Sequence, residues 1–306
     1  MIVELRAPTL DDVDSLTDLV NRHADELYGE REETPESMAL WLTGPGLDPV
    51  TDIRIALVGR EVRGYVDIDA DPDPRYWVDL RVPPSEAAKL RETLMDWAET
   101  QAAERGAGKA DALIRFYTSS IDVPTSKELE ARGYRLIRHS YRMRIDFDDD
   151  PPQPEWPEGI SVRTGTADDA RTAYETQHET FEDSWEFNPY PYDEWGHWMT
   201  SYEGFDPSLW FIAEADGEVA GVSLCRVHEA EENLGWVRVL GVRRPWRRRG
   251  LGRALLLHTF HEFRRRGLSA VGLGVDAESL TGANRLYENA GMSVVRKSNI
   301  YEKSLS

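Results

Sequence analysis

The stretch that decides the fold reads Val239-Leu240-Gly241-Val242-Arg243-Arg244-Pro245-Trp246-Arg247-Arg248-Arg249-Gly250-Leu251-Gly252-Arg253-Ala254-Leu255-Leu256. An apolar, β-rich run ends at Val242, a turn with two glycines follows, and a helix begins near Leu251. Leu255, Thr259 and Phe263 fall on one face of this helix because they are spaced four residues apart. In such a strand, turn and helix, free backbone N–H groups and the helix dipole point to the same place, so the pattern predicts an anion site.

The charge of this stretch is opposite to that of the whole chain. The sequence carries a net charge of −20 at pH 7, whereas seven arginines gather here, at positions 238, 243, 244, 247, 248, 249 and 253. Gly250 and Gly252 would let the backbone approach a phosphate closely. This local positive charge in an acidic chain predicts a polyanionic ligand. The alternative is a basic turn on a solvated surface. The spacing Arg247-x-x-Gly250-x-Gly252 matches neither the G-x-G-x-x-G dinucleotide pattern nor a G-x-x-x-x-G-K-[ST] loop.

Two halves of the sequence resemble each other at a nearly constant offset. Arg6 and Arg163 lie in matching segments (163 − 6 = 157), as do Gly64 and Gly221 (221 − 64 = 157) and Gly133 and Gly291 (291 − 133 = 158). An acidic, proline-rich segment at 148–157 separates the halves and is the best linker candidate. The sequence therefore predicts a tandem duplication with domains at 1–147 and 158–306.

Each half shows the same order of expected elements. A short strand precedes a helix, at 11–23 and again at 167–180, and aromatic segments and a hairpin follow. In the second half the hairpin spans 209–227, the next strand covers 236–242, and another strand covers 271–275. This interleaving indicates an α/β or α+β fold with a mixed sheet.

Composition limits the classes of function. With 306 residues, 40% of them hydrophobic and 30% charged, the chain fits a soluble protein of two domains. It has no apolar run long enough for a transmembrane helix and no signal-peptide pattern, and its single cysteine permits no intrachain disulfide, so a cytoplasmic protein without membrane contact is expected. The acidic balance argues against nucleic-acid binding. It favours a cationic small substrate such as an amine, or serves solubility alone.

The arginine–glycine stretch resembles the coenzyme A-binding motif of the GCN5-related N-acetyltransferase (GNAT) superfamily, which reads [Q/R]-x-x-G-x-[G/A]. A second family motif, N-x-x-A-x-x-x-Y-x-x-x-G-F, is similar to the segment from Asn284 through Tyr287 to Gly291. The tandem arrangement is similar to mycothiol synthase and related actinobacterial acetyltransferases. The resemblance implies two tandem GNAT-like domains, each a mixed, mostly antiparallel sheet flanked by helices, with acetyl-CoA bound in the second.

The resemblance also implies roles for individual residues. The coenzyme would contact the backbone of the strand end and of the turn, together with the side chains of the turn, at Leu240, Gly241, Val242, Arg247, Arg248, Arg249, Gly250, Leu251, Gly252 and Arg253. Asn284 would contact the pantetheine arm. Tyr287 would be the general acid that protonates the departing thiolate, and the alternative is a tyrosine that only packs.

The first half lacks both features. Aligning Gly133 with Gly291 places Leu129 opposite Tyr287, and Val82-Pro83-Pro84-Ser85-Glu86 stands where the second half has its glycine–arginine turn. We therefore expect the first half to bind no coenzyme and to serve as a structural or substrate-shaping partner.

The acceptor side of the site is less defined by the sequence. Candidates for a substrate-binding carboxylate or base are Glu182, Asp183, Glu231 and Glu232, and solvated surface residues are the alternative for each. Mycothiol synthases carry an acidic residue near the start of the central strand, where this chain has Trp236. The aromatic segment at 185–198 predicts either a wall of the acceptor pocket or ordinary core packing.

No covalent intermediate or metal is expected. Cys225 lies in a β-rich run without a catalytic partner, which indicates a buried structural cysteine and direct transfer. The segment 258–262 lacks the H-E-x-x-H order of a metal site. The resemblance thus implies transfer of an acetyl group from acetyl-CoA to an amine of a small molecule. Two alternatives stay open: a non-catalytic acyl-CoA-binding module and a protein N-terminal acetyltransferase. The oligomeric state is also open.

Overall fold

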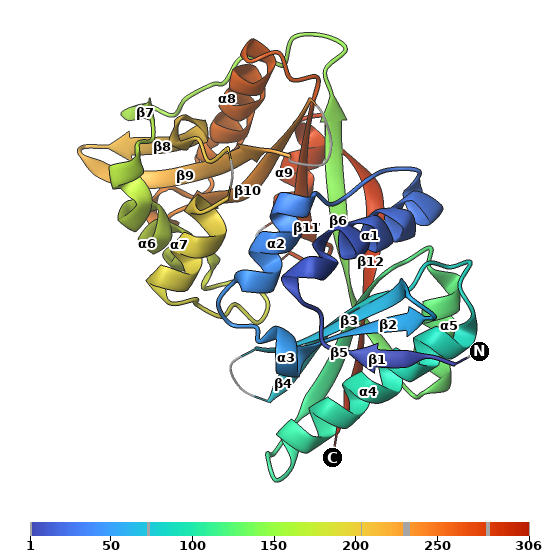
Figure 1. The fold of residues 1–306 in the computed structure, drawn as a ribbon. Coiled ribbons are helices and arrows are strands. Elements are labelled where there is room, and N and C mark those ends of the chain that lie inside the picture. The colour runs from blue at the N-terminus through green and yellow to red at the C-terminus, as the bar shows by residue number, and fades with distance from the viewer. Residues whose placement is uncertain (1, 72–73, 203, 229–232, 280–281, 306) are drawn as a thin grey trace. The chain divides into compact units, whose positions relative to one another are not determined.

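The computed structural model describes residues 2–71, 74–202, 204–228, 233–279 and 282–305 (Figure 1). The chain divides into two compact units. Unit 1 comprises residues 1–140 and 297–306, and unit 2 comprises residues 141–296. Within the described ranges, no helix is both long enough and apolar enough to cross a membrane.

Unit 1 is a mixed sheet flanked by helices. Its strands follow the order β1-β2-β3-β4-β5-β12, in which β4 and β5 are parallel and the other pairs are antiparallel. Its elements are β1 (Glu4–Arg6), α1 (Val13–Tyr28), α2 (Pro35–Thr43), α3 (Pro49–Asp52), β2 (Ile53–Val58), β3 (Glu61–Asp71), β4 (Arg75–Arg81), α4 (Ala88–Gly106), β5 (Leu113–Ser119), α5 (Val123–Ala131) and the later part of β12 (Ser293–Ser304).

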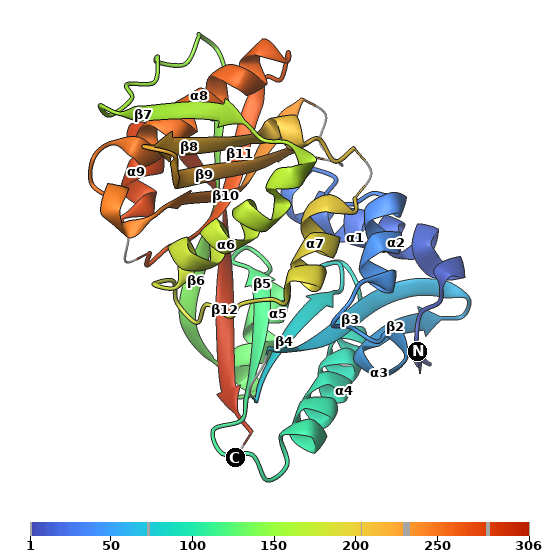
Figure 2. The ribbon, with the colours of Figure 1, turned by 90° about the vertical axis from the view of Figure 1, so that its left-hand side faces the viewer.

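Unit 2 repeats this plan, with the strand order β6-β11-β10-β9-β8-β7 (Figure 2). Strands β10 and β11 are parallel, and β7 to β10 pair in antiparallel fashion. Its elements are the later part of β6 (Arg135–Asp146), β7 (Ile160–Thr164), α6 (Ala170–Phe181), α7 (Tyr192–Thr200), β8 (Trp210–Ala215), β9 (Glu218–Val227), β10 (Leu234–Val242), α8 (Leu251–Arg265), β11 (Ala270–Asp276) and α9 (Ala283–Asn289).

The last strand of each repeat belongs to two units. Residues 141–146 of β6 fall in unit 2, and residues 297–304 of β12 fall in unit 1, where Ser298–Ser304 pair with β5. The boundaries of the two units therefore differ from the expected division at the acidic linker, with domains at 1–147 and 158–306. The reason is length: β6 and β12 each have 12 residues, about twice a typical strand, so each can contribute to both units.

The duplication is visible in atomic detail at the start of each unit. Thr9 and Asp12 form a capping box, and Arg6 donates to Asp12 at 2.6 Å. At the offset of 157, Thr166 and Asp169 form the same box, with Arg163 donating to Asp169 at 2.7 Å. The structure therefore contains two repeats of one α/β plan, as the sequence predicted.

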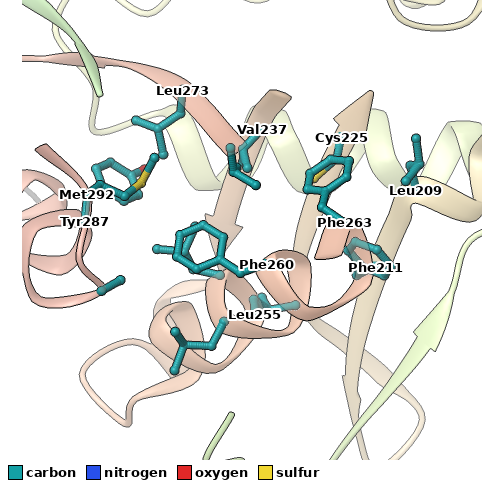
Figure 3. Close-up of a cluster of buried hydrophobic side chains, with 14 of the residues drawn as sticks. Leu209, Phe211, Cys225, Val237, Leu255, Phe260, Phe263, Leu273, Tyr287 and Met292 are labelled. Carbon is teal, nitrogen blue, oxygen red and sulfur yellow. The ribbon is translucent and has the colours of Figure 1, made fainter. Parts of the chain in front are cut away.

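Each sheet buries apolar side chains on both of its faces. In unit 2 one cluster lies under α8 and α9 and includes Phe260, Phe263 and Tyr287, as Figure 3 shows. The cluster on the opposite face lies under α6 and α7 and includes Trp195 and Trp210. Strands β8 to β10 are therefore covered by helices on both faces, and side chains that alternate along β10 face different helices.

The two capping boxes predict a pH-dependent contribution to stability. The hydrogen bond from arginine lowers the pKa of Asp12 and of Asp169 from 3.8 to about 2. Asp169→Asn should lower the free energy of unfolding by about 1 kcal/mol at neutral pH. Because the folded pKa lies below the unfolded one, this stabilisation is present above about pH 4 and is lost as the pH falls toward about 2.

Urea unfolding at several pH values tests this expectation, and Asp12→Asn is the matched variant in unit 1. The difference between wild type and each variant should shrink as the solution is acidified below about pH 4. A difference that stays constant there would show that the carboxylate charge contributes nothing.

Candidate active site

The parallel ladder between β10 and β11 ends before either strand does. Its registered pairs run from Leu234↔Ala270 to Val237↔Leu273, although β10 continues to Val242 and β11 to Asp276. On its other side β10 stays paired with β9 as far as Val242↔Gly221, with an irregularity between Val237 and Val239. Among the described residues, the end of β10 thus has no ladder partner on the side of β11. Apart from the carbonyl oxygen of Val242, which accepts from Arg247, the backbone donors and acceptors on this side are available to a ligand.

Gly241 is required by packing against α6. A Cβ atom at Gly241 would lie 2.3 Å from Oγ1 of Thr180, and one at Gly221 would lie 2.7 Å from the carbonyl oxygen of Gly241. The hydroxyl of Thr180 donates to the carbonyl oxygen of Thr176 at 2.8 Å. The sequence pointed to Gly241 but missed Thr180. A small residue near the end of an amphipathic helix carries no pattern that would reveal its partner.

The turn after β10 leads into a helix that has no side-chain cap. Arg248 and Gly250 both have positive φ, of 61° and 87°. Gly250 is the N-cap residue of α8, and the first backbone bond of the helix runs from the N–H of Ala254 to the carbonyl oxygen of Gly250. Earlier N–H groups of the first turn therefore lack intrahelical partners and, together with the helix dipole, are suited to bind an anion.

The arginines around the turn fall into two groups. Arg243 pairs with Glu179 at 2.9 Å, Arg244 pairs with Asp183 at 2.8 Å, and Arg247 pairs with Asp183 at 2.7 Å. Arg247 also donates to the carbonyl oxygens of Val242 and Thr180, at 2.9 and 3.1 Å. These three side chains fasten the turn to the end of α6.

The second group is Arg248, Arg249 and Arg253. In the described part of the chain, no hydrogen bond or ion pair engages their side chains, and Arg248 and Arg249 are exposed. They flank the uncapped start of α8. Their guanidinium groups are therefore the ones available for an anionic ligand.

The candidate carboxylates at the end of α6, Glu182 and Asp183, pair with arginines of the turn. Hydrogen bonds from Arg244 and Arg247 lower the pKa of Asp183 to about 2, which makes it a weak base. Glu182 lies 3.3 Å from Arg244 and is exposed. Neither residue is positioned as an acceptor-binding group by these contacts. Glu231 and Glu232 lie outside the described residues.

Helix α9 brings Tyr287 and Asn284 to the same end of the sheet. A Cβ atom at Gly252 would lie 3.1 Å from Leu286 and 3.6 Å from Val242, so the start of α8, the end of β10 and α9 converge there. The amide nitrogen of Asn284 donates to the carbonyl oxygens of Asp276 and Ala277, at 3.1 and 2.8 Å. Among the residues that the structure describes, its buried Oδ1 has no hydrogen-bond partner.

Tyr287 is buried next to Met292 (Figure 3), with 8% of its surface exposed. Burial alone raises the pKa of its phenol to about 12, so it is neutral at physiological pH. Within the described residues its hydroxyl makes no hydrogen bond. A neutral phenol without a protein partner is suited to donate a proton to a ligand.

Other residues singled out in the sequence have structural roles. Cys225 is 1% exposed, and burial raises the pKa of its thiol to about 12, which confirms a buried structural cysteine. Trp195 is 2% exposed in the core under α7, where its Nε1 donates to Gln177 at 2.8 Å. His258 packs against Phe211, and burial lowers its pKa. No group of three or more His, Cys, Asp or Glu residues in the described chain is arranged to hold a metal.

In unit 1, the turn that aligns with the glycine–arginine turn of unit 2 contacts a carboxylate. The N–H and hydroxyl groups of Ser85, before α4, donate to Glu26 of α1 at 2.9 and 2.6 Å. Glu86 in the same turn pairs with Arg22 and Arg63, at 3.2 and 3.0 Å. Leu129 is buried in the core. A phosphate would meet a carboxylate there rather than free arginines.

The contact between Gly241 and Thr180 predicts the effect of a small change. Gly241→Ala should destabilise the protein by about 2 kcal/mol, because the new methyl group overlaps Oγ1 of Thr180. Thermal unfolding would measure the loss. Thr180→Ala in the Gly241→Ala background should recover part of the stability, since it removes Oγ1 but leaves the Cβ 3.0 Å away. The absence of any recovery would contradict the overlap.

Comparison with known proteins identifies the family of this chain. Residues 170–292 match the Acetyltransferase (GNAT) family. A mycothiol acetyltransferase of Streptomyces coelicolor is 30% identical over 264 residues, which cover 84% of this chain and 81% of that protein. A mycothiol acetyltransferase of Nocardia farcinica is 28% identical over 304 residues, which cover 87% of this chain and 92% of that protein.

Two solved structures extend the likeness across both units. A GCN5-related N-acetyltransferase from Sphaerobacter thermophilus superimposes with a TM-score of 0.80 at 31% identity, covering 99% of this chain and 96% of its own. A tandem GNAT protein from the clavulanic acid biosynthesis pathway shares the fold, with a TM-score of 0.77 at 17% identity over 100% and 99% of the two chains. This chain belongs to the GNAT family of acetyltransferases and is an acyltransferase.

Proposed function

We propose that this enzyme transfers an acetyl group from acetyl-CoA directly to the amine of a small molecule, at one site in unit 2. The observation that carries the proposal is the early end of the β10–β11 ladder. Within the described chain, this early end leaves backbone groups of β10 without a ladder partner, beside the start of α8 and the hydroxyl of Tyr287. GNAT enzymes use acetyl-CoA as co-substrate, and mycothiol acetyltransferases, among the relatives, act on a small molecule by name.

The residues present fit a coenzyme that carries a pyrophosphate and an amide-rich arm. The N–H groups at the start of α8 would bind the pyrophosphate, and Arg248, Arg249 and Arg253 would neutralise it. The end of β10, from Leu240 to Val242, would pair with the amides of the arm. The buried Oδ1 of Asn284 supplies an acceptor for an N–H group of the same arm.

The chemistry follows from these groups. Acetyl-CoA supplies the acetyl group as a thioester. A backbone N–H of β10 would polarise the thioester carbonyl, as an oxyanion hole does. The amine nitrogen forms a bond to the acyl carbon as the carbon–sulfur bond breaks, and Tyr287 gives its proton to the departing sulfur. The proton lost by the amine leaves through water, since Asp183 is too weak a base to take it.

Direct transfer is favoured over a covalent intermediate. Cys225 is the only cysteine of the chain. Its raised pKa and burial leave it without thiolate character, and its Sγ lies 3.3 Å from Ser223. A buried, protonated thiol is not a nucleophile.

Coenzyme binding should depend on the free arginines. Arg249→Ala and Arg253→Ala should each weaken coenzyme A binding by about 10-fold, because each removes a charged contact to phosphate. Calorimetry measures both the affinity and the number of sites, which should be one per chain. Arg265→Ala is the control, since Arg265 lies at the opposite end of α8 and pairs with Glu262. Equal losses in all three variants would contradict a specific phosphate site, and two sites per chain would contradict a coenzyme-free unit 1.

Tyr287→Phe should slow turnover by about 100-fold or more, with the coenzyme affinity unchanged, because only proton donation is removed. Steady-state rates with an amine panel and coenzyme calorimetry are the measurements. Tyr301→Phe is a matched control, since Tyr301 is a buried tyrosine of unit 1 that donates to Glu130. An unchanged turnover in Tyr287→Phe would remove Tyr287 from the mechanism.

A further inference from the structure

One large side chain covers the sheet of unit 2 where the β10–β11 ladder ends. Trp236 of β10 is the registered partner of Gly272 on β11, one pair before the last registered pair, Val237↔Leu273. A Cβ atom at Gly272 would lie 2.7 Å from Cζ3 and 2.9 Å from Cε3 of Trp236. The indole therefore extends across the ladder and lies directly over β11, where a residue without a side chain leaves room for it.

The indole lies on the face of the sheet that α6 and α7 cover. Val237 and Leu273 point the other way, into the cluster under α8 and α9, where Figure 3 labels both. Because side chains alternate along a strand, Trp236 and Gly272 point toward α6 and α7. Val239 joins them on this face, since β10 is irregular between Val237 and Val239. At the end of the ladder, apolar side chains thus occupy both faces.

Neighbouring groups hold the indole of Trp236 in place. The guanidinium of Arg142 lies 5.0 Å from its ring centre, and the ring of His228 packs edge-on against it with 5.5 Å between the centroids. The backbone of β11 at Gly272 lies beneath the ring, and the residue is half-buried. A ring with contacts on several sides forms a fixed wall at this end of the gap.

Beyond the indole, the same face of β11 has no side chain at the next position. Gly274 follows Gly272 on this face, because side-chain positions alternate along the strand. Gly274 is exposed, and a Cβ atom there would meet nothing within 4 Å. The two glycines form a strip of backbone that is open at Gly274 and is filled by the indole at Gly272.

The path of the coenzyme determines where its acyl group would lie. With the pyrophosphate at the start of α8 and the arm paired with β10 from Val242 toward Leu240, the thioester would point along the sheet at the last registered ladder pair. An acyl chain longer than acetyl would have to leave the plane of the sheet there. On the α8 side it would meet the buried Val237 and Leu273, and on the α6 side it would meet the indole of Trp236.

We propose that Trp236 restricts the acyl donor to acetyl-CoA, because its indole fills the space over Gly272 that the further carbons of a longer acyl chain would occupy. This inference rests on the proposed function and names the residue that selects its donor. One methylene group changes the discrimination of an apolar pocket by roughly 10- to 200-fold. The fixed position of the ring makes such discrimination possible, since a mobile ring would move aside for a longer chain.

A series of acetyl-, propionyl- and butyryl-CoA tests the proposal with the full chain and the most active amine of a panel. Wild type should prefer acetyl-CoA to butyryl-CoA by about 10-fold or more in kcat/KM. Trp236→Ala should reduce this preference by about 10-fold, because the strip over Gly272 becomes open. Trp97→Ala should keep it. Trp97 is a matched control, a half-buried tryptophan of unit 1 with the guanidinium of Arg54 4.9 Å from its ring centre.

A second substitution that refills the space separates its loss from a general disturbance of the site. Gly272→Val in the Trp236→Ala background should restore the preference for acetyl-CoA. Of the three atoms nearest to a Cβ at Gly272, only the carbonyl oxygen of Met143 would remain, at an ordinary distance of 3.5 Å. Thermal unfolding shows whether each variant is folded. If Trp236→Ala is not, Trp236→Leu takes its place and should shift the preference in the same direction by less.

The outcomes separate the two proposals. A wild type that uses butyryl-CoA as well as acetyl-CoA, or a folded Trp236 variant with the wild-type preference, would overturn the role of Trp236 while the proposed function stands. If no donor acylates any amine of the panel, the proposed function loses its support, and binding decides the inference. In calorimetry, Trp236→Ala should then favour butyryl-CoA over acetyl-CoA about 10-fold more than wild type does. Equal affinity ratios, or no binding of either donor, would overturn it.

Discussion

The proposed active site depends on one constraint of the backbone: the ladder between β10 and β11 stops at Val237 and Leu273 while both strands continue. A parallel pair that stayed in register to the ends of its strands would satisfy these donors and acceptors internally. In unit 1 the pairs between β4 and β5 run from Arg75↔Leu113 to Asp79↔Tyr117, which leaves only two residues of β4 beyond the last pair, against five of β10 in unit 2. The two repeats share a fold, and the length of this opening distinguishes them.

The arginines around the turn after β10 fall into two groups with different partners. Arg243, Arg244 and Arg247 are neutralised by the end of α6 and hold the turn in shape. Within the described residues the side chains of Arg248, Arg249 and Arg253 have no partner, so they would remain for the proposed ligand. The paired arginines hold the other three in position. The positive φ at Arg248 costs free energy, so this turn persists only when its surroundings fix it. The same place in unit 1 is occupied by Glu26 against Ser85, so that repeat satisfies its turn internally.

The sequence predicted the parts of this arrangement that local patterns encode. The offset of 157 predicted the repeats, and the strand, glycine turn and helix around Gly250 predicted the uncapped helix start. It could not predict that β6 and β12 each contribute to both units, because hydrophobic alternation does not specify a strand's partner. Nor could it sort the arginines into two groups, since Asp183 is 64 residues from Arg247 in the chain. It suggested carboxylates for the acceptor only because their charge is negative. In the structure, Asp183 instead pairs with Arg244 and Arg247 of the turn.

The weak carboxylate and the buried phenol give the proposed reaction a consistent interpretation. Asp183 pairs with Arg244 and Arg247, which lower its pKa to about 2, so it would not take a proton from an incoming ammonium group. A neutral amine is the form that attacks an acyl carbon, so the proposed reaction depends on solvent to remove that proton. Tyr287 stays neutral because burial raises its pKa to about 12, and it would give its proton only to the departing sulfur.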